Sequence, residues 1–392
     1  MCYNAFMKVH ELSFYSKFQC VMGSCPDTCC HGWQIVLDAD TVQKYMAKKG
    51  RYGIWLRSSL TRHNGTTMFK GSRRKCPFLS KDLLCKVQLS LGEDYLSDVC
   101  RIFPRQRINY GYFAEESLFL ACPQACRLFL NNLDHLCYKT VDRNISYAKS
   151  GTNDDAEYLQ ELAEIRLALT EQIMDHPLPR PMLYTGLLSY AKALQQSYIA
   201  GYAPSNGSSR PDFSKPVHTN LAAHIREADA PFIIPHDITY AMLTSSFYHI
   251  FLKTVSPFLY DLCRTYLKEF KWLTSAKGDA KLGMLLEQLH VRHPDTERIL
   301  RGYLTYYLLE NFLTVYEDYS FLHNIATGIM HTHLLELFFA LYCEKNHRLT
   351  DDDIIRIITV YNRRGRHNDE IEKEMYEKLK RFLGTPAGKQ CP

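Results

Sequence analysis

The chain has 392 residues, of which 46% are hydrophobic and 23% are charged, so it is long enough for one large or two ordinary globular domains and is not a disordered protein. Its 47 Lys and Arg and 42 Asp and Glu leave a net charge of only +5, which argues against a dedicated nucleic-acid binder. Polar residues interrupt the first positions and no run of about 18 apolar residues occurs, so we expect no targeting segment and no membrane span. We therefore expect a cytoplasmic protein whose cysteines stay reduced.

The first part of the chain, residues 1–145, is predicted to be an irregular, cysteine-rich region with a few short strands. Residues 32–38 are predicted to form a short strand, and a helix with Asp38 or Asp40 as its N-cap follows. Residues 107–120 resemble a hairpin, or a strand that runs into a helix.

Two smaller features close this region. The acidic pair Glu115 and Glu116 is predicted to lie on a solvated face of the hairpin segment. Residues 122–133 have the apolar spacing of a helix, and Pro123 is acceptable near its start.

The second part, residues 155–385, is predicted to be an all-helical domain, and a polar segment near 146–155 is the expected boundary. Apolar residues recur there at helical spacing in a series of segments, namely 154–176, 181–202, 237–273 with a break near Pro257, 300–319, 332–343, 351–364 and 369–383. The three aspartates 351–353 are predicted to cap and charge the start of one helix. Neither a G-x-G-x-x-G nor a Walker signature occurs, so the fold class is predicted to be mainly α.

Cysteine is distributed very unevenly, with 11 of the 14 cysteines before residue 138. Thiols at this density in a reduced chain favour a soft metal centre, either zinc or an iron–sulfur cluster. The spacings C-x4-C-x3-CC, C-x8-C, C-x14-C and C-x3-C match neither the ferredoxin runs nor a paired C-x2-C zinc ribbon, so they leave the metal open. A buried free cysteine can also act as a small hydrophobic residue. We give this interpretation to five cysteines: Cys2, Cys137, Cys263, Cys343 and Cys391.

Residues 14–133 resemble the flagellin lysine-N-methylase family. The resemblance rests on the ordered motifs FQCVMGSCPDTCCHGWQIVLD, KCPFLSKDLLCKVQLSLGEDYLSDVCRIFPR and ESLFLACPQACRLFL. A fainter resemblance continues at residues 308–316, LLENFLTVY. The chain has Gln124-Ala125-Cys126 where the family has Glu-Ala-Ala, and this departure leaves Cys126 out of the expected ligand set.

The resemblance implies transfer of methyl groups from S-adenosylmethionine to surface lysines of flagellin, with no nucleic-acid and no membrane partner. It also implies a metal centre, for which a [4Fe-4S] cluster is the favoured species and zinc the alternative. Eight cysteines are the candidate ligands: Cys20, Cys25, Cys29, Cys30, Cys76, Cys85, Cys100 and Cys122. A radical S-adenosylmethionine enzyme would carry C-x3-C-x2-C, which this chain lacks, and a neutral lysine amine attacks a methylsulfonium carbon without an electron. We therefore expect the centre to brace the fold.

The sequence assigns no catalytic residue and offers one candidate cofactor site. On a helix predicted over 299–316, Tyr307 and Glu310 lie on one face next to Asn311, so these three residues are the candidate S-adenosylmethionine site. Glu310 would hold the ammonium group or the ribose. The competing interpretation is a plain amphipathic helix with its tyrosines at the margin of the apolar face.

Two functions of other classes compete with methyl transfer. The chain could be a metal-binding protein that shares only the cysteine region, although metal handling alone would not need the long helical part. It could instead be a partner-binding scaffold of the flagellar export system, with zinc as a staple. Methylation of flagellin by the pure protein separates the enzyme from both alternatives.

Overall fold

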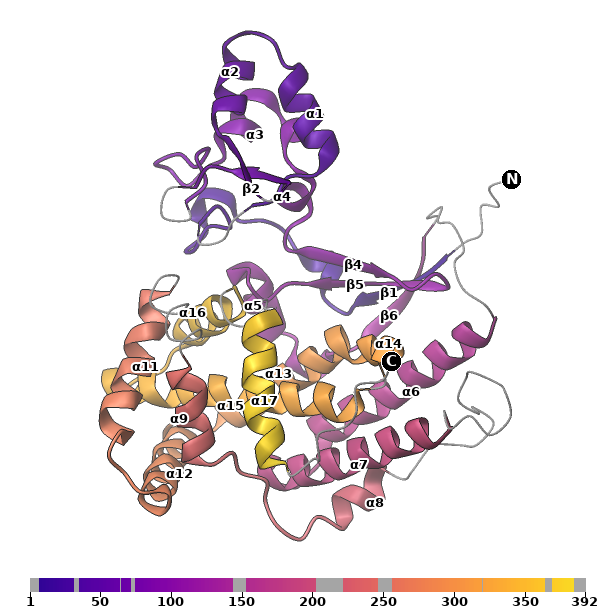
Figure 1. Ribbon diagram of the computed structural model, residues 1–392, viewed down its shortest axis with the longest axis vertical. Helices are drawn as coiled ribbons and strands as arrows, with labels where there is room; N and C mark the ends of the chain where they lie inside the picture. Colours follow the sequence, from indigo (N-terminus) through magenta and orange to yellow (C-terminus); the bar gives the residue numbers. More distant parts are fainter. Residues whose placement is uncertain are drawn as a thin grey trace.

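The structure is a computed structural model that describes residues 7–31, 35–63, 65–71, 75–143, 153–201, 221–245, 256–318, 320–363 and 369–383. Over these ranges the chain is mainly helical with a few short strands, which confirms the predicted fold class. Figure 1 shows three parts: a small lobe, a four-stranded sheet below it, and a larger helical body on the far side of the sheet.

The lobe is built from short helices around one small hairpin. Its elements are α1 (Ala39–Ala47), α2 (Gly50–Ser58), β2 (Leu60–His63), β3 (Thr66–Phe69), α3 (Lys86–Leu91) and α4 (Asp98–Ile102). Asp38 is the N-cap of α1, as predicted, because its carboxylate accepts a hydrogen bond from the Thr41 amide at 2.7 Å. The lobe has a small hydrophobic core of its own that includes Tyr45, Leu56 and Phe78.

The sheet has the strand order β4-β5-β1-β6. Its strands are β1 (Met7–Leu12), β4 (Arg105–Asn109), β5 (Phe113–Leu118) and β6 (Tyr138–Arg143). Strand β1 runs parallel to β5 and antiparallel to β6, whereas β4 and β5 form an antiparallel hairpin. The predicted hairpin at residues 107–120 is therefore confirmed, and the lobe is inserted between β1 and β4.

The predicted solvent exposure of Glu115 and Glu116 is wrong, because both side chains are buried in β5. Glu115 accepts a hydrogen bond from the Arg166 guanidinium at 2.9 Å, and Glu116 is paired with Arg107 on the neighbouring strand. These arginines compensate the buried carboxylates, and Arg166 comes from a helix 51 residues later in the chain.

The helical body contains most of the remaining elements. They are α5 (Pro123–Leu130), α6 (Asn153–Asp175), α7 (Arg180–Gly201), α8 (Leu221–Arg226), α9 (His236–Thr244), α11 (Pro257–Phe270), α12 (Ser275–Arg292), α13 (Asp295–Asn311), α14 (Val315–Asp318), α15 (Phe321–Asn346), α16 (Asp351–Tyr361) and α17 (Asp369–Phe382). Among the described residues there are also five short 3-10 helices, of which η3 belongs to the lobe: η1 (Tyr15–Lys17), η2 (Met22–Ser24), η3 (Glu93–Tyr95), η4 (Leu133–His135) and η5 (Phe312–Thr314).

Helix α15 is the central element of the body and packs against α7, α11, α12, α13, α16 and α17. By length and composition alone it could cross a membrane, but its apolar stretch is entirely buried by these neighbours. It is therefore placed as the core helix of a globular body. The predicted cap at 351–353 is confirmed, since Thr350 and Asp353 form a capping box at the start of α16.

The predicted domain boundary lies mainly within residues 144–152, which are outside the described residues. The buried cores divide the chain in a different way. One core joins residues 35–87 within the lobe, while the main core joins residues 12–18 and 113–136 with the helices of the body. The sheet is thus packed on the helical body, and the lobe alone has a separate core.

Candidate functional site

Two adjoining cavities lie where the lobe meets the sheet and the body, and all eight candidate cysteines line them. The larger thiol cavity, of about 540 Å³, is lined by Cys20, Cys29, Cys30, Cys76, Cys85 and Cys100. The smaller thiol cavity, of about 290 Å³, is lined by Cys20, Cys25, Cys29, Cys30, Cys85 and Cys122. Four cysteines are common to both, so the two cavities form one site that the folding of residues 20–122 brings together.

Backbone pairing brings the separate cysteine segments into contact. The amide of Cys76 donates to the carbonyl of Cys30 at 2.8 Å, and His31 forms a bridge with Lys75. Cys85 precedes α3 and forms a β-bridge with Leu79, so these two residues close the turn between them. These contacts link the segment that contains Cys29 and Cys30 to the lobe.

The remaining ligand candidates come from helix ends. Cys100 lies on the short helix α4 and packs against the lobe core, whereas Cys122 is the N-cap residue of α5 in the body. Cys126 is fully buried one turn further along α5 and lines neither cavity. This position agrees with its exclusion from the ligand set.

Burial keeps Cys29, Cys30, Cys100 and Cys122 in their protonated form in the absence of a metal, because it raises their pKa values. Burial raises the pKa of Cys100 and of Cys122 to about 11. The hydrogen bond with Cys29 lowers the pKa of Cys30, but the bond with Cys76 and burial outweigh it and raise that pKa to about 12. The same Cys29–Cys30 hydrogen bond, together with burial, holds the pKa of Cys29 far above its usual value. A metal would have to displace these protons in order to bind.

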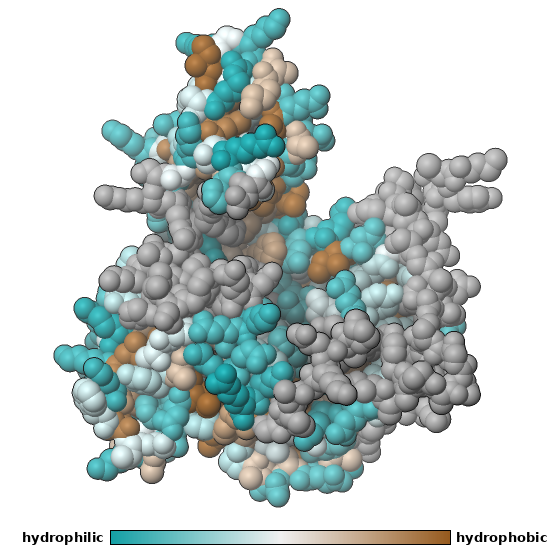
Figure 2. Space-filling view, in the orientation of Figure 1, coloured by the Kyte–Doolittle hydropathy of each residue, from teal (hydrophilic) through white to brown (hydrophobic). Residues whose placement is uncertain are grey.

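Basic side chains also line the site. Arg101 and Arg105 line the larger cavity. Arg105 donates a hydrogen bond to the carbonyl of Phe18 at 3.2 Å, and Arg101 pairs with Asp98. Figure 2 shows hydrophobic surface at the foot of the lobe, beside the notch that separates the lobe from the sheet.

The donor set fits a soft metal in kind, because every candidate ligand is a thiol. A single tetrahedral zinc needs sulfur atoms about 3.8 Å apart, given Zn–S bonds of about 2.3 Å. Among the described residues, no three His, Cys, Asp or Glu side chains converge so that they could hold one ion. Thiols arranged around a cavity are compatible with a polynuclear cluster, in which each thiolate binds a different iron.

The candidate cofactor residues on α13 lie in the core of the body. Tyr307 is buried against Gly328 of α15, and Glu310 accepts hydrogen bonds from Ser117 at 3.3 Å and from Tyr306 at 3.0 Å. The Asn311 amide donates to the carbonyl of Tyr307 at 2.7 Å. None of these three residues lines the cavities described here, so their cofactor role stays a prediction.

The competing interpretation of this helix also changes. Tyr303 and Tyr307 are buried rather than placed at the margin of an apolar face, and nearly every residue from Ile299 to Glu310 is buried. From Ile299 onward, helix α13 is therefore enclosed by α6, α12, α15 and strand β5, which is the environment of a core helix.

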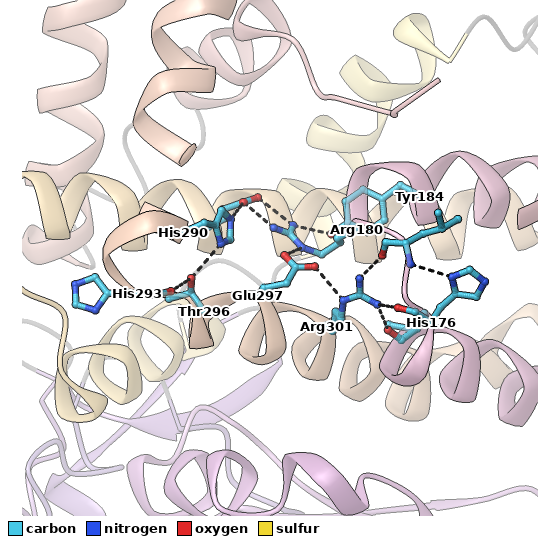
Figure 3. Close-up of polar contacts among 11 residues, drawn as sticks. His176, Arg180, Tyr184, His290, His293, Thr296, Glu297 and Arg301 are labelled. Atoms are coloured by element: carbon cyan, nitrogen blue, oxygen red, sulfur yellow. Dashed lines mark hydrogen bonds and ion pairs between the residues drawn. The ribbon is translucent and has the colours of Figure 1, made fainter. Parts of the chain in front are cut away.

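A third cavity, of about 520 Å³, opens between α7, α12 and α13, and its polar wall is the ionic network shown in Figure 3. Arg180 donates to both carboxylate oxygens of Glu336, at 3.0 and 2.6 Å, and to Glu297 at 3.1 Å. His290 bonds the same Glu336 carboxylate at 2.6 Å. We did not anticipate this network from the sequence, although a lone acidic residue within the apolar run HLLELFFALY was a usable signal.

Comparison with known proteins gives the family of the chain. A model of the FliB lysine N-methylase C-terminal domain matches residues 240–385, which include α11–α17. The flagellar biosynthetic protein FliU of Salmonella muenchen is 38% identical over 133 residues, which cover 32% of this chain and 79% of that protein. No solved structure matches the chain.

Two proteins named lysine-N-methylase, from Salmonella typhimurium strain LT2 and Salmonella choleraesuis strain SC-B67, are also 38% identical over 133 residues. The matched part of the chain spans only 33% of the length of each of these two proteins. The match to FliU covers most of that relative, and the C-terminal model covers the later helices of the body, α11–α17. The chain therefore belongs to the flagellin lysine-N-methylase family.

Proposed function

We propose that this protein is a lysine N-methyltransferase that transfers methyl groups from S-adenosylmethionine to surface lysines of flagellin. The observation that carries the proposal is the family match: the FliB lysine N-methylase model over residues 240–385, together with two relatives named lysine-N-methylase. The name of a third relative, a flagellar biosynthetic protein, supports a flagellar substrate.

We further propose that the thiol cavities hold a [4Fe-4S] cluster, with zinc as the alternative. Four of the eight cysteines would bind the cluster, and the others would pack around it. All twelve cysteines among the described residues are free thiols, which supports action in the reducing cytoplasm. Bound there, the centre would join the lobe to the body, and we assign it a structural role.

The transfer itself needs a neutral amine and a methylsulfonium carbon in line. The lysine nitrogen forms a bond to the methyl carbon, the carbon–sulfur bond breaks with its electron pair on sulfur, and a proton leaves the nitrogen. A free lysine has a pKa of about 10.4, so the enzyme must desolvate the amine or give its proton to a base. No electron is consumed, and S-adenosylhomocysteine is the second product.

The proposed S-adenosylmethionine site remains Tyr307, Glu310 and Asn311. Replacing Tyr307 with Phe removes one hydroxyl, and replacing Glu310 with Gln removes one charge while retaining an acceptor for Ser117 and Tyr306. If these residues bind the cofactor, both variants should weaken S-adenosylmethionine binding at wild-type metal content. Unchanged binding, measured by calorimetry on folded protein, would move the cofactor site elsewhere.

The function is tested with anaerobically purified protein, flagellin and labelled S-adenosylmethionine, with and without a reductant. We expect methylated flagellin lysines and S-adenosylhomocysteine in both conditions. Folded, metal-loaded protein that transfers no label would favour a metal-binding protein or a flagellar scaffold. A strict need for reductant, or 5′-deoxyadenosine among the products, would show that the metal centre takes part in the chemistry.

A further inference from the structure

Arg363 follows helix α16 of the helical body, and its side chain extends into the thiol site. Its guanidinium donates to the carbonyl of Ala121 through Nε at 3.2 Å and Nη2 at 2.8 Å. Nη1 donates to the carbonyls of Thr28 at 3.3 Å and His31 at 3.5 Å, and Nη2 donates to the carbonyl of Asp27 at 3.2 Å. One side chain therefore connects two segments that lie more than 240 residues before it.

These two segments contain the cysteines of the smaller thiol cavity. Cys29 and Cys30 lie between Thr28 and His31, and Cys122 follows Ala121 directly. Arg363 itself lines that cavity, and its side chain is only 1% exposed. The carbonyls it contacts are the ones whose positions fix where these thiols point.

The charge of Arg363 is compensated within the same site. Its Nη1 lies 2.9 Å from the Asp27 carboxylate. A buried guanidinium is costly unless its donors and charge are satisfied, so this arrangement holds the segments tightly.

We propose that Arg363 is the positioning residue of the thiol site: it holds the Asp27–His31 segment and Ala121 around the smaller cavity and supplies positive charge beside the bound centre. The proposal rests on the proposed metal centre. All candidate ligands of the site come from the N-terminal third of the chain. Through the side chain of Arg363, the C-terminal domain also takes part in assembling this site. A metal centre held by thiolates is anionic, so a fixed cation beside it stabilises the loaded form.

Arg301 provides a matched control within the same body. It is also a buried arginine that donates to three carbonyls, those of Ile173 at 3.0 Å, His176 at 2.9 Å and Leu178, and it pairs with Glu297 at 2.9 Å. Its contacts tie the end of α6 to α13, as Figure 3 shows, and none of them involves a cysteine segment. Loss of Arg301 therefore removes a comparable structural tie without touching the thiol site.

The test compares Arg363→Met and Arg363→Lys with Arg301→Met in the full chain, purified anaerobically. Metal and sulfide per chain and resistance to a chelator are the readouts. Arg363→Met should lower metal affinity about 10- to 100-fold, as losses of outer-shell partners do, and Arg363→Lys should recover part of that loss. Arg301→Met should lower the melting temperature and retain wild-type metal content. Equal metal retention in Arg363→Met and wild type, or equal loss in Arg301→Met, would overturn the proposal.

A second measurement does not depend on which metal is bound. In metal-free protein, Arg363→Met should increase alkylation of Cys29, Cys30 and Cys122, mapped by peptide mass spectrometry, relative to the buried Cys263. If that variant does not fold, Asp27→Asn removes only the ion pair and should give a smaller change in the same direction. Unchanged alkylation in the folded variants would count against the positioning role. If Arg363→Met loses metal but the wild-type protein transfers no methyl group, the positioning role is supported and only the proposed methyltransferase function is contradicted.

Discussion

Arg180, the first residue of α7, donates hydrogen bonds to both carboxylate oxygens of Glu336, which lies 156 residues later in the middle of α15. Both side chains are almost fully buried. Burial raises the pKa of Glu336, but the Arg180 guanidinium and His290 together outweigh it and hold that pKa well below its usual range. This pair ties the start of one long helix to the central helix of the body.

Replacing Glu336 with Gln should cost about 3 to 5 kcal/mol of unfolding free energy, because it leaves the buried Arg180 without its main counter-charge. Urea denaturation of the two proteins measures the difference. Glu344→Gln is the matched control on the same helix, since its pair with Arg292 is 4.0 Å long and exposed. That change should cost less than about 0.5 kcal/mol. Similar losses in both variants would contradict the importance of the buried pair.

The stability of the body should also depend on pH through His333. Burial lowers the pKa of this histidine to about 4, whereas an unfolded histidine titrates near 6.5. Neutral His333 therefore contributes stability that is fully present above pH 6.5 and is lost as pH falls toward 4, by about 3 kcal/mol in total. In urea denaturation between pH 6.5 and 4.5, His333→Gln should reduce the slope of unfolding free energy against pH. Parallel curves for variant and wild type would show that His333 does not titrate on unfolding.

Removal of the metal should affect the lobe far more than the helical body. Among the residues of the lobe that the structure describes, eight buried hydrophobic side chains form its core, which is small for a strong independent fold. After treatment with a chelator under reducing conditions, limited proteolysis should cut within residues 35–100, while the body resists. The same fragments before and after chelation would indicate that the lobe is stable without a metal.

Changes to individual cysteines should separate ligands from packing residues. Replacing Cys25, Cys76, Cys85 or Cys100 with Ser should give poorly folded or metal-free protein, because the free energy of metal binding is part of the free energy of folding. Cys263→Ala and Cys343→Ala, which alter buried thiols of the helical body, should cause only modest losses of stability and no loss of metal. Soluble yield and metal content distinguish the groups, and a uniform effect in all six variants would argue against a centre in the thiol cavities.

Local pattern in the sequence was enough to predict the helical body, the β4–β5 hairpin and the cap at Asp38, because periodicity and capping depend on neighbours a few residues away. The family resemblance, rather than spacing, singled out the eight cysteines that line the cavities. Local pattern failed for Glu115, which looks solvated within its own strand and is buried only because Arg166 arrives from another helix. Arg363 and the network around Arg180 were missed for the same reason, since their partners are fixed by the fold and not by spacing.

The lobe is inserted between two strands of one sheet, and this position decides whether the lobe can be deleted or replaced. Strand β1 is parallel to β5, and β4 is antiparallel to β5. The chain therefore leaves the sheet at Leu12 and returns to it at Arg105 at the same end of the strands, two strands apart. Two strand spacings amount to about 10 Å, a gap that a short linker spans. We therefore expect that the lobe can be replaced without a change in strand order if residues 13–18, which include side chains of the main core, are retained. An excised lobe lacks Cys122 and Arg363, so the thiol site exists only where lobe and body meet.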